Sequence, residues 1–138
     1  MRIHNTVLTA ATEVAKKSDV VRGKVGAACF TNTGNVLAIA HNKVIYGQTH
    51  KKQWTIHAEM ALLAKLVRVR AASRYGIKNL NILVVRYKPE IDGLAIAKPC
   101  VNCRHYLNIA GIKVYYSDNN GKIKILRKGK NDYSKEWL

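Results

Sequence analysis

The sequence predicts an α/β protein: a three-layer α/β/α sandwich around a mixed five-stranded sheet. Three observations predict it. A pair of strands opens the sheet, apolar strands then alternate with helical segments, and a second pair of strands closes the chain. The length of 138 residues is typical of one domain. We therefore expect a single domain over residues 1–138, ending in a basic tail over residues 126–138.

The first half of the chain supplies a helix, a hairpin and a loop. Ile3–Lys17 carries apolar residues at helical spacing and predicts the first helix. Val25–Phe30 and Asn35–Ala40 flank a turn rich in Thr, Asn and Gly, and predict two paired strands. The polar segment Tyr46–Thr55 is expected to be a loop that leads into the next helix.

The second half alternates helices with strands. We expect a helix over His57–Arg70, a strongly apolar strand over Leu80–Tyr87, a loop over Lys88–Lys98 and a third helix over Cys100–Ala110. In that third helix Arg104 and His105 are expected on the exposed face, with a hydrogen-bond donor role beside Cys103 as the alternative.

The chain closes with a predicted hairpin. Lys113–Ser117 and Lys122–Leu126 are separated by Asp118-Asn119-Asn120-Gly121, and Asn-Gly is a strong signal for a tight turn. Parallel strands need a crossover of a dozen or more residues, and this connection is far shorter. The last two strands are therefore expected to be antiparallel.

Three residues have the chemistry of a zinc site. Zn²⁺ prefers imidazole and thiolate ligands, and a catalytic site takes three from the protein and leaves one position to water. His57, Cys100 and Cys103 supply one imidazole and two thiols. The two cysteines are three residues apart, so the first turn of a helix places both sulfurs on one side. Helix N-termini also favour the thiolate form.

Glu59 follows His57 by two residues and is the expected catalytic group. Its carboxylate can sit over the open coordination position and take a proton from the water there. Such a water has a pKa near 7, so a nearby carboxylate is a competent proton shuttle.

The two motifs together carry a resemblance. His57-Ala58-Glu59 and Pro99-Cys100-Val101-Asn102-Cys103 resemble the H-x-E and P-C-x-x-C signature of zinc-dependent base deaminases. The sequence is similar to the cytidine deaminase-like superfamily over about Val21 to Ile125. This resemblance implies Zn²⁺ as cofactor and hydrolytic deamination as the reaction. It favours cytosine over adenine, because the closing hairpin is unlike the parallel arrangement of the tRNA adenosine enzymes.

The resemblance also implies substrate contacts. Asn42 is expected at the sugar or nucleotide, the backbone N–H of Ala58 at the base carbonyl, and the backbone at Lys98 near the exocyclic amine. Relatives often have Ser or Glu where this chain has Lys98. The resemblance therefore does not define this wall of the pocket, nor the exact substrate. Trp54, beside Lys51 and Lys52, suits base stacking next to phosphate contacts, although it equally suits a core position.

Net charge gives the main indication of the substrate. Lys and Arg number 24 against 8 Asp and Glu, a formal net charge of +16. Such a surface attracts polyanions, so a nucleic-acid strand, DNA or RNA, is the leading expected substrate and partner. The hairpin topology instead favours free cytidine, deoxycytidine or deoxycytidylate. A tRNA adenosine deaminase and a zinc-stabilised nucleic-acid-binding module are further alternatives.

Cellular location and assembly rest on weaker patterns. Only three cysteines occur, two of them assigned to zinc, and no signal peptide or run of 18 apolar residues is present. We therefore expect an intracellular, cytoplasmic protein without a membrane span. An oligomer is compatible with the resemblance.

Overall fold

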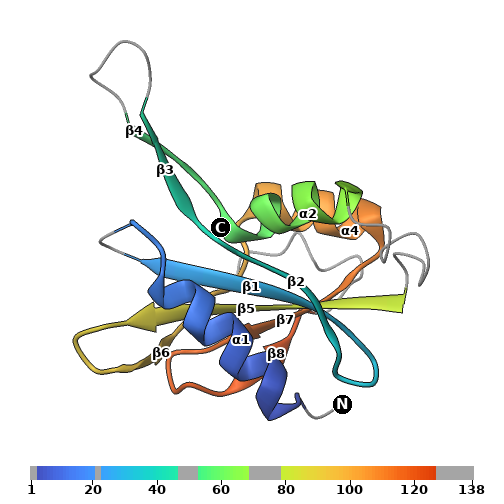
Figure 1. Ribbon diagram of the computed structural model, residues 1–138, viewed down its shortest axis with the longest axis horizontal. Helices are drawn as coiled ribbons and strands as arrows, with labels where there is room; N and C mark the ends of the chain where they lie inside the picture. Colours follow the sequence, from blue (N-terminus) through green and yellow to red (C-terminus); the bar gives the residue numbers. More distant parts are fainter. Residues whose placement is uncertain (1–2, 21–22, 47–52, 69–78, 127–138) are drawn as a thin grey trace.

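A computed structural model describes residues 3–20, 23–46, 53–68 and 79–126 of the chain (Figure 1). The chain is a mixed α/β fold, as predicted. Its elements in order are α1 (Asn5–Lys16), β1 (Lys24–Thr31), β2 (Val36–His41), β3 (Lys43–Tyr46), β4 (Gln53–Ile56), α2 (Ala58–Arg68), β5 (Leu80–Lys88), β6 (Gly93–Ala95), α4 (Val101–Ala110), β7 (Lys113–Ser117) and β8 (Ile123–Ile125).

The main sheet has six strands and not the five predicted: the five expected strands lie in the order β2-β1-β5-β7-β8, and the short β6 pairs with β5 as the sixth. β1 pairs antiparallel with both β2 and β5, whereas β5 and β7 run parallel. Parallel pairing here follows from the crossover through α4, which returns the chain to the same end of the sheet. The sheet is therefore mixed, and β5 lies at its centre.

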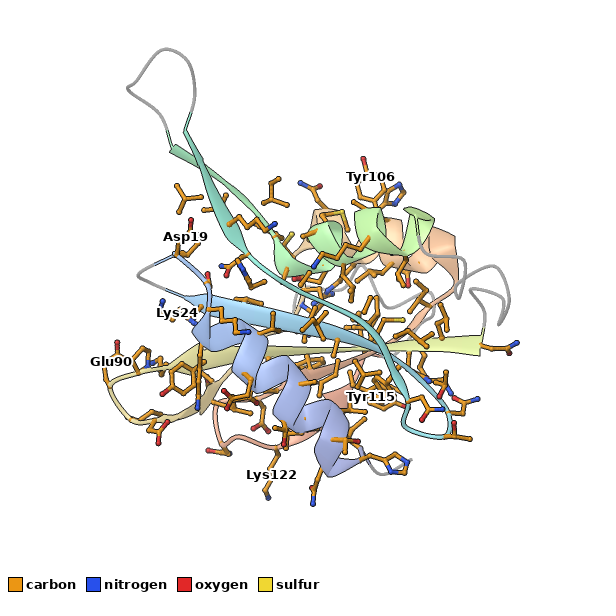
Figure 2. The ribbon with its side chains drawn as sticks, viewed as in Figure 1. Asp19, Lys24, Glu90, Tyr106, Tyr115 and Lys122 are labelled. Atoms are coloured by element: carbon orange, nitrogen blue, oxygen red, sulfur yellow. The ribbon has the colours of Figure 1, made fainter. Side chains whose placement is uncertain are left out.

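Alternation along the central strands builds two cores. Ile82 and Val84 of β5 belong to a core cluster with Leu62 of α2 and Leu107 of α4. The intervening residues of β5 instead join a second cluster with α1. Side chains fill both spaces between the sheet and its helices (Figure 2). Because strand side chains alternate between faces, one apolar strand supplies both cores of the three-layer sandwich.

The closing hairpin is antiparallel, as predicted. Tyr115 pairs with Ile125 and Ser117 with Ile123. The Asp118 carboxylate accepts hydrogen bonds from the backbone N–H groups of Asn120 at 2.8 Å and Lys122 at 2.9 Å, which organises the tight turn. These two hydrogen bonds hold the carboxylate in its charged form and lower the pKa of Asp118.

Two segments predicted as loops contain strands. The ends of the expected loop over Tyr46–Thr55 lie in β3 and β4. These strands are antiparallel, with Lys43 opposite Ile56 and Tyr46 opposite Gln53, and they extend away from the main sheet (Figure 1). Within the expected loop over Lys88–Lys98, β6 pairs with the end of β5 beyond the residues that bind β7. The two predictions were therefore wrong at these residues, because each short strand is fixed by the strand it pairs with and has no long apolar period of its own.

The first helix packs unusually close to the sheet. A Cβ added to Gly26 of β1 would lie 2.3 Å from the carbonyl oxygen of Ala11 and 2.7 Å from the backbone nitrogen of Ala15. Real Cβ atoms do not approach other atoms so closely, so only glycine permits this contact.

The predicted tail lies, apart from Leu126, outside the described residues. The part of the chain that the structure describes contains no helix with the length and apolar composition needed to cross a bilayer.

We predict that Gly26→Ala destabilises the fold by about 1–3 kcal/mol, because the added methyl group forces α1 away from β1. Urea or thermal unfolding measures the change. Gly93→Ala is the matched control, since its Cβ would meet its nearest neighbour, a side-chain atom of Ile91, at an ordinary 3.4 Å. Equal stability of the two variants would contradict this close packing of α1 on the sheet.

Candidate active site

Two helices begin at the same place. His57 immediately precedes α2, and its carbonyl oxygen accepts the Ala61 N–H at 3.0 Å. Cys100 is the N-cap of α4, where its sulfur accepts the Cys103 N–H at 3.5 Å. The helix starts therefore lie within one residue of their predicted positions. Both helix N-termini present a partial positive charge, which favours thiolate sulfurs between them.

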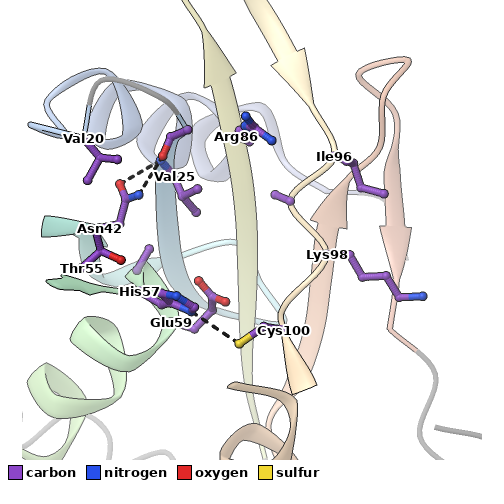
Figure 3. Close-up of a pocket in the computed structure, with 13 residues that line it drawn as sticks. Val20, Val25, Asn42, Thr55, His57, Glu59, Arg86, Ile96, Lys98 and Cys100 are labelled. Carbon is purple, nitrogen blue, oxygen red and sulfur yellow. Dashed lines mark hydrogen bonds between the residues drawn. The ribbon is translucent and has the colours of Figure 1, made fainter. Parts of the chain in front are cut away.

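The predicted metal ligands converge in space. One potential ligand atom from each of His57, Cys100 and Cys103 lies within 4.8 Å of the others. The Nδ1 atom of His57 is 3.2 Å from the Cys103 sulfur. It is 3.5 Å from the Cys100 sulfur, a contact that Figure 3 draws as a dashed line. Cys103 is buried, whereas His57 and Cys100 are exposed. The group is thus open on one side.

The chemistry of the donor set fits zinc. Burial, and then the charge of Glu59, raise the pKa of the Cys103 thiol, so its thiolate is costly without a nearby cation. One imidazole and two thiols form a nitrogen and sulfur set that Zn²⁺ prefers, and three protein ligands leave a fourth position for water. His57, Cys100 and Cys103 could therefore hold a metal ion of this type.

Glu59 lies in the first turn of α2 and is only 4% exposed. Burial raises the pKa of its carboxyl group, although its own backbone N–H, the charge of His57 and a contact with Cys103 act in the opposite direction. A buried carboxyl group with a raised pKa can both accept and return a proton near neutral pH. Its position beside the metal ligands is the one that the motif spacing predicts.

A cavity of about 360 Å³ opens onto these residues. This volume lies in the range of small-molecule sites. Figure 3 shows Val20 and Asn42 on one side and Ile96 and Lys98 on the other. The described residues that line the cavity are Val20, Gly23, Val25, Asn42, Thr55, His57, Ala58, Glu59, Arg86, Ile96, Ala97, Lys98 and Cys100.

Asn42 lines the cavity and also holds one wall together. Its Oδ1 atom accepts the Val25 N–H at 3.0 Å and the Ser18 hydroxyl at 2.5 Å, while its Nδ2 atom donates to the Gly23 carbonyl at 2.7 Å. The side chain is buried. Asn42 therefore fixes the segment before β1 against the site, and within the described residues its amide nitrogen donates one of the two hydrogen bonds that it can make.

The opposite wall is held by the closing hairpin. The Ala97 N–H donates to the Ser117 carbonyl at 2.9 Å, and the Ile96 N–H donates to the Asn119 side chain at 3.1 Å. Arg104 donates from Nε to the Pro99 carbonyl at 3.0 Å. The chain entering α4 is thereby fixed by contacts from β7, its turn and the helix itself.

The structure corrects the expectation for Arg104 and does not describe the side chain of Trp54. Arg104 is buried, not exposed, because its guanidinium turns back to the loop before α4; His105 is exposed as predicted. The side chain of Trp54, with Lys51 and Lys52, lies outside the described part of the chain.

Of the expected substrate contacts, Asn42, Ala58 and Lys98 line the same cavity as His57, Glu59 and Cys100. Sequence reasoning did not assign Val20 or Gly23 to it. Asn42 holds Gly23 there directly, and it holds Val20 through Ser18, whose hydroxyl accepts the Val20 N–H and donates to Asn42. No local pattern signals these contacts.

The fold is a mixed sheet between helical layers. At the N-termini of two of its helices lie one imidazole, two thiols and a buried carboxyl group. This combination defines a hydrolytic metalloenzyme of the zinc deaminase type. A comparison with family models agrees with this class. The model described as "Cytidine and deoxycytidylate deaminase zinc-binding region" matches residues 1–117. The chain therefore belongs to the cytidine and deoxycytidylate deaminase family, whose cofactor is zinc.

Solved structures with the same fold are distant in sequence. The apo dCMP deaminase of cyanophage S-TIM5 is 24% identical, with 83% of this chain and 81% of that chain covered and a TM-score of 0.60. The cytidine deaminase of Mycobacterium tuberculosis is 22% identical, with 88% of each chain covered and a TM-score of 0.54. Among curated protein sequences, the comparison found no match. At these identities the likeness confirms the fold alone.

We predict that the purified protein carries about one zinc ion per chain and that Cys103→Ser and His57→Ala lose most of it, because each removes one of three ligands. Elemental analysis by mass spectrometry measures the metal. Cys29→Ala is the matched control, since Cys29 is buried in β1 and belongs to the core rather than to the metal group. Full zinc content in Cys103→Ser would contradict the assignment.

Proposed function

We propose that the protein is a zinc-dependent deaminase that hydrolyses the amino group of cytosine in a nucleotide, leaving uracil and ammonia. One observation carries the proposal: the predicted ligands His57, Cys100 and Cys103 meet within 4.8 Å, and Glu59 lies on the same cavity. A structural zinc site would not need a buried carboxyl group at that position.

Each residue has a chemical task in this proposal. His57, Cys100 and Cys103 would hold the zinc ion, which when bound lowers the pKa of a coordinated water to about 7 and so supplies a nucleophile at neutral pH. Glu59 accepts one proton of the attacking water and delivers it to the ring nitrogen, and then passes the second proton of that water to the departing amine, which leaves as ammonia. Its burial keeps this proton exchange away from bulk water.

The remaining predicted contacts orient the base. Ala58 lines the cavity from the first turn of α2, and its N–H is proposed to donate to the base carbonyl oxygen. The backbone at Lys98 would accept from the exocyclic amine, and the remaining N–H of Asn42 would reach the sugar. These three contacts come from three different elements, so together they fix the base in position before reaction.

We give a free cytosine nucleotide precedence as substrate. The β7–β8 hairpin is antiparallel and its turn supports the cavity wall through Asn119. This arrangement resembles the branch of the superfamily that acts on free nucleosides and nucleotides. The hairpin forms part of the site, whereas the net charge is a property of the whole chain. We therefore give the hairpin more weight in choosing the substrate.

A second candidate substrate is cytosine in a nucleic-acid strand, and the net charge of +16 favours it. A free nucleotide needs only a few cations, whereas a strand contacts many. In this case the base would leave its stack to enter the cavity.

We predict that Glu59→Ala lowers turnover by about 100- to 10,000-fold while zinc stays bound, because the variant removes the proton shuttle and no ligand. An ammonia-release assay and metal analysis of the same sample measure both effects. Glu13→Ala, which removes an exposed carboxylate of α1, is the control and is expected to behave as the wild type. Substantial turnover by Glu59→Ala would contradict the proposed mechanism.

We predict that deoxycytidylate is converted faster than single-stranded DNA, duplex DNA or single-stranded RNA when each is supplied at one low salt concentration. Conversion of the polymers alone, lost steeply as salt is raised, would assign the strand as substrate instead. Binding of polymers without any conversion would favour a zinc-stabilised binding module.

A further inference from the structure

One cation continues the buried face of the central strand. Ile82 and Val84 of β5 pack in the core on the side of α2 and α4. Arg86 is the next residue in this row, since alternate strand residues share a face. It is partly buried and lines the cavity. A guanidinium therefore stands where the strand pattern would place another apolar residue.

The guanidinium of Arg86 has an unmet hydrogen bond. In the part of the chain that the structure describes, its Nε is the one buried side-chain nitrogen or oxygen without a hydrogen-bond partner. Leaving a buried donor unpaired is unfavourable, so a native protein that does so needs a reason. A ligand that accepts from Arg86 would supply it.

The surroundings leave room for such a ligand. A Cβ added to Gly23 would lie 3.6 Å from the Nε atom of Arg86, so the backbone of Gly23 borders the guanidinium without covering it with a side chain. Asn42 fixes that backbone through the Gly23 carbonyl. Figure 3 shows Arg86 and Cys100 at opposite ends of the group of residues that line the cavity.

The charges of the cavity favour an anion at that end. Its described lining residues include two cations, Arg86 and Lys98, and a single carboxyl group, Glu59. Glu59 belongs to the metal end, in the first turn of α2 directly after His57 and Ala58. A planar guanidinium presents paired donors that match the oxygens of a phosphate.

We infer that Arg86 binds the 5′-phosphate of the substrate, with the cytosine base at the opposite, metal-ligand end of the same cavity. This inference rests on the proposed function. It makes Arg86 a specificity-determining residue that selects a nucleotide over a nucleoside. The shared chemistry is a phosphate group, whether it belongs to a free monophosphate or to the end of a strand.

The test is a comparison of substrates with and without the phosphate. In the wild type, kcat/KM is expected to be higher for deoxycytidylate than for deoxycytidine. Arg86→Gln should lower the ratio of the two values by about 10- to 100-fold, the usual effect of losing a charged hydrogen bond. Arg86→Lys should retain part of the preference. Lys88→Gln is the matched control, because Lys88 is an exposed cation two residues further along β5 and does not line the cavity.

Inorganic phosphate is a probe that needs no turnover. In a ³¹P NMR titration it should bind the wild type and Lys88→Gln, and bind Arg86→Gln much more weakly. Single-stranded DNA with a 5′-terminal cytosine, with or without its terminal phosphate, distinguishes a strand from a free nucleotide as the source. A phosphate effect confined to deoxycytidylate assigns the free form.

The outcomes separate the two proposals. Equal losses on deoxycytidylate and deoxycytidine in Arg86→Gln, or a wild type without preference for the phosphate, would overturn the role of Arg86 while leaving the deaminase intact. A wild type that converts no cytosine substrate would overturn the proposed function. In that case the phosphate titration still decides whether Arg86 binds an anion.

Discussion

The convergence of two helix N-termini on one face of the sheet is the constraint on which the site depends. α2 and α4 each begin beside the central strands, and their first residues bring one imidazole and two thiols together. The two positive helix ends favour thiolates there, whereas burial and the charge of Glu59 raise the pKa of the Cys103 thiol and disfavour its thiolate. A divalent cation with thiolate ligands resolves this conflict, because it balances the sulfurs and is itself balanced by them.

The cavity beside this centre is held together by parts of the chain that supply no metal ligand. Asn42 holds the segment before β1, and the closing hairpin holds the segment before α4 through Ser117 and Asn119. The walls therefore depend on long-range hydrogen bonds as well as on the apolar packing of Val25 and Ala97. The sheet thus sets the distance between the starts of α2 and α4. The loops set the shape of the substrate site.

Much of the arrangement was predictable because its signals are local. The alternating apolar residues of β5 and the helical spacing of α1 mark their elements, and the spacings around His57 and Cys100 identify the donor set. The pairing of β3 with β4, the short β6 and the burial of Arg104 were not predicted, since each depends on a contact made after folding. The net charge of +16 indicates a polyanion without saying which residues of the fold would bind it.

The central claim is a zinc ion held by three protein ligands with one position open, and X-ray absorption at the zinc edge of the purified protein tests it most directly. The account predicts two sulfur neighbours at about 2.3 Å and nitrogen or oxygen neighbours at about 2.0–2.1 Å, one of them an exchangeable water. A zinc shell without the two sulfurs, or one filled by four protein ligands, would contradict it.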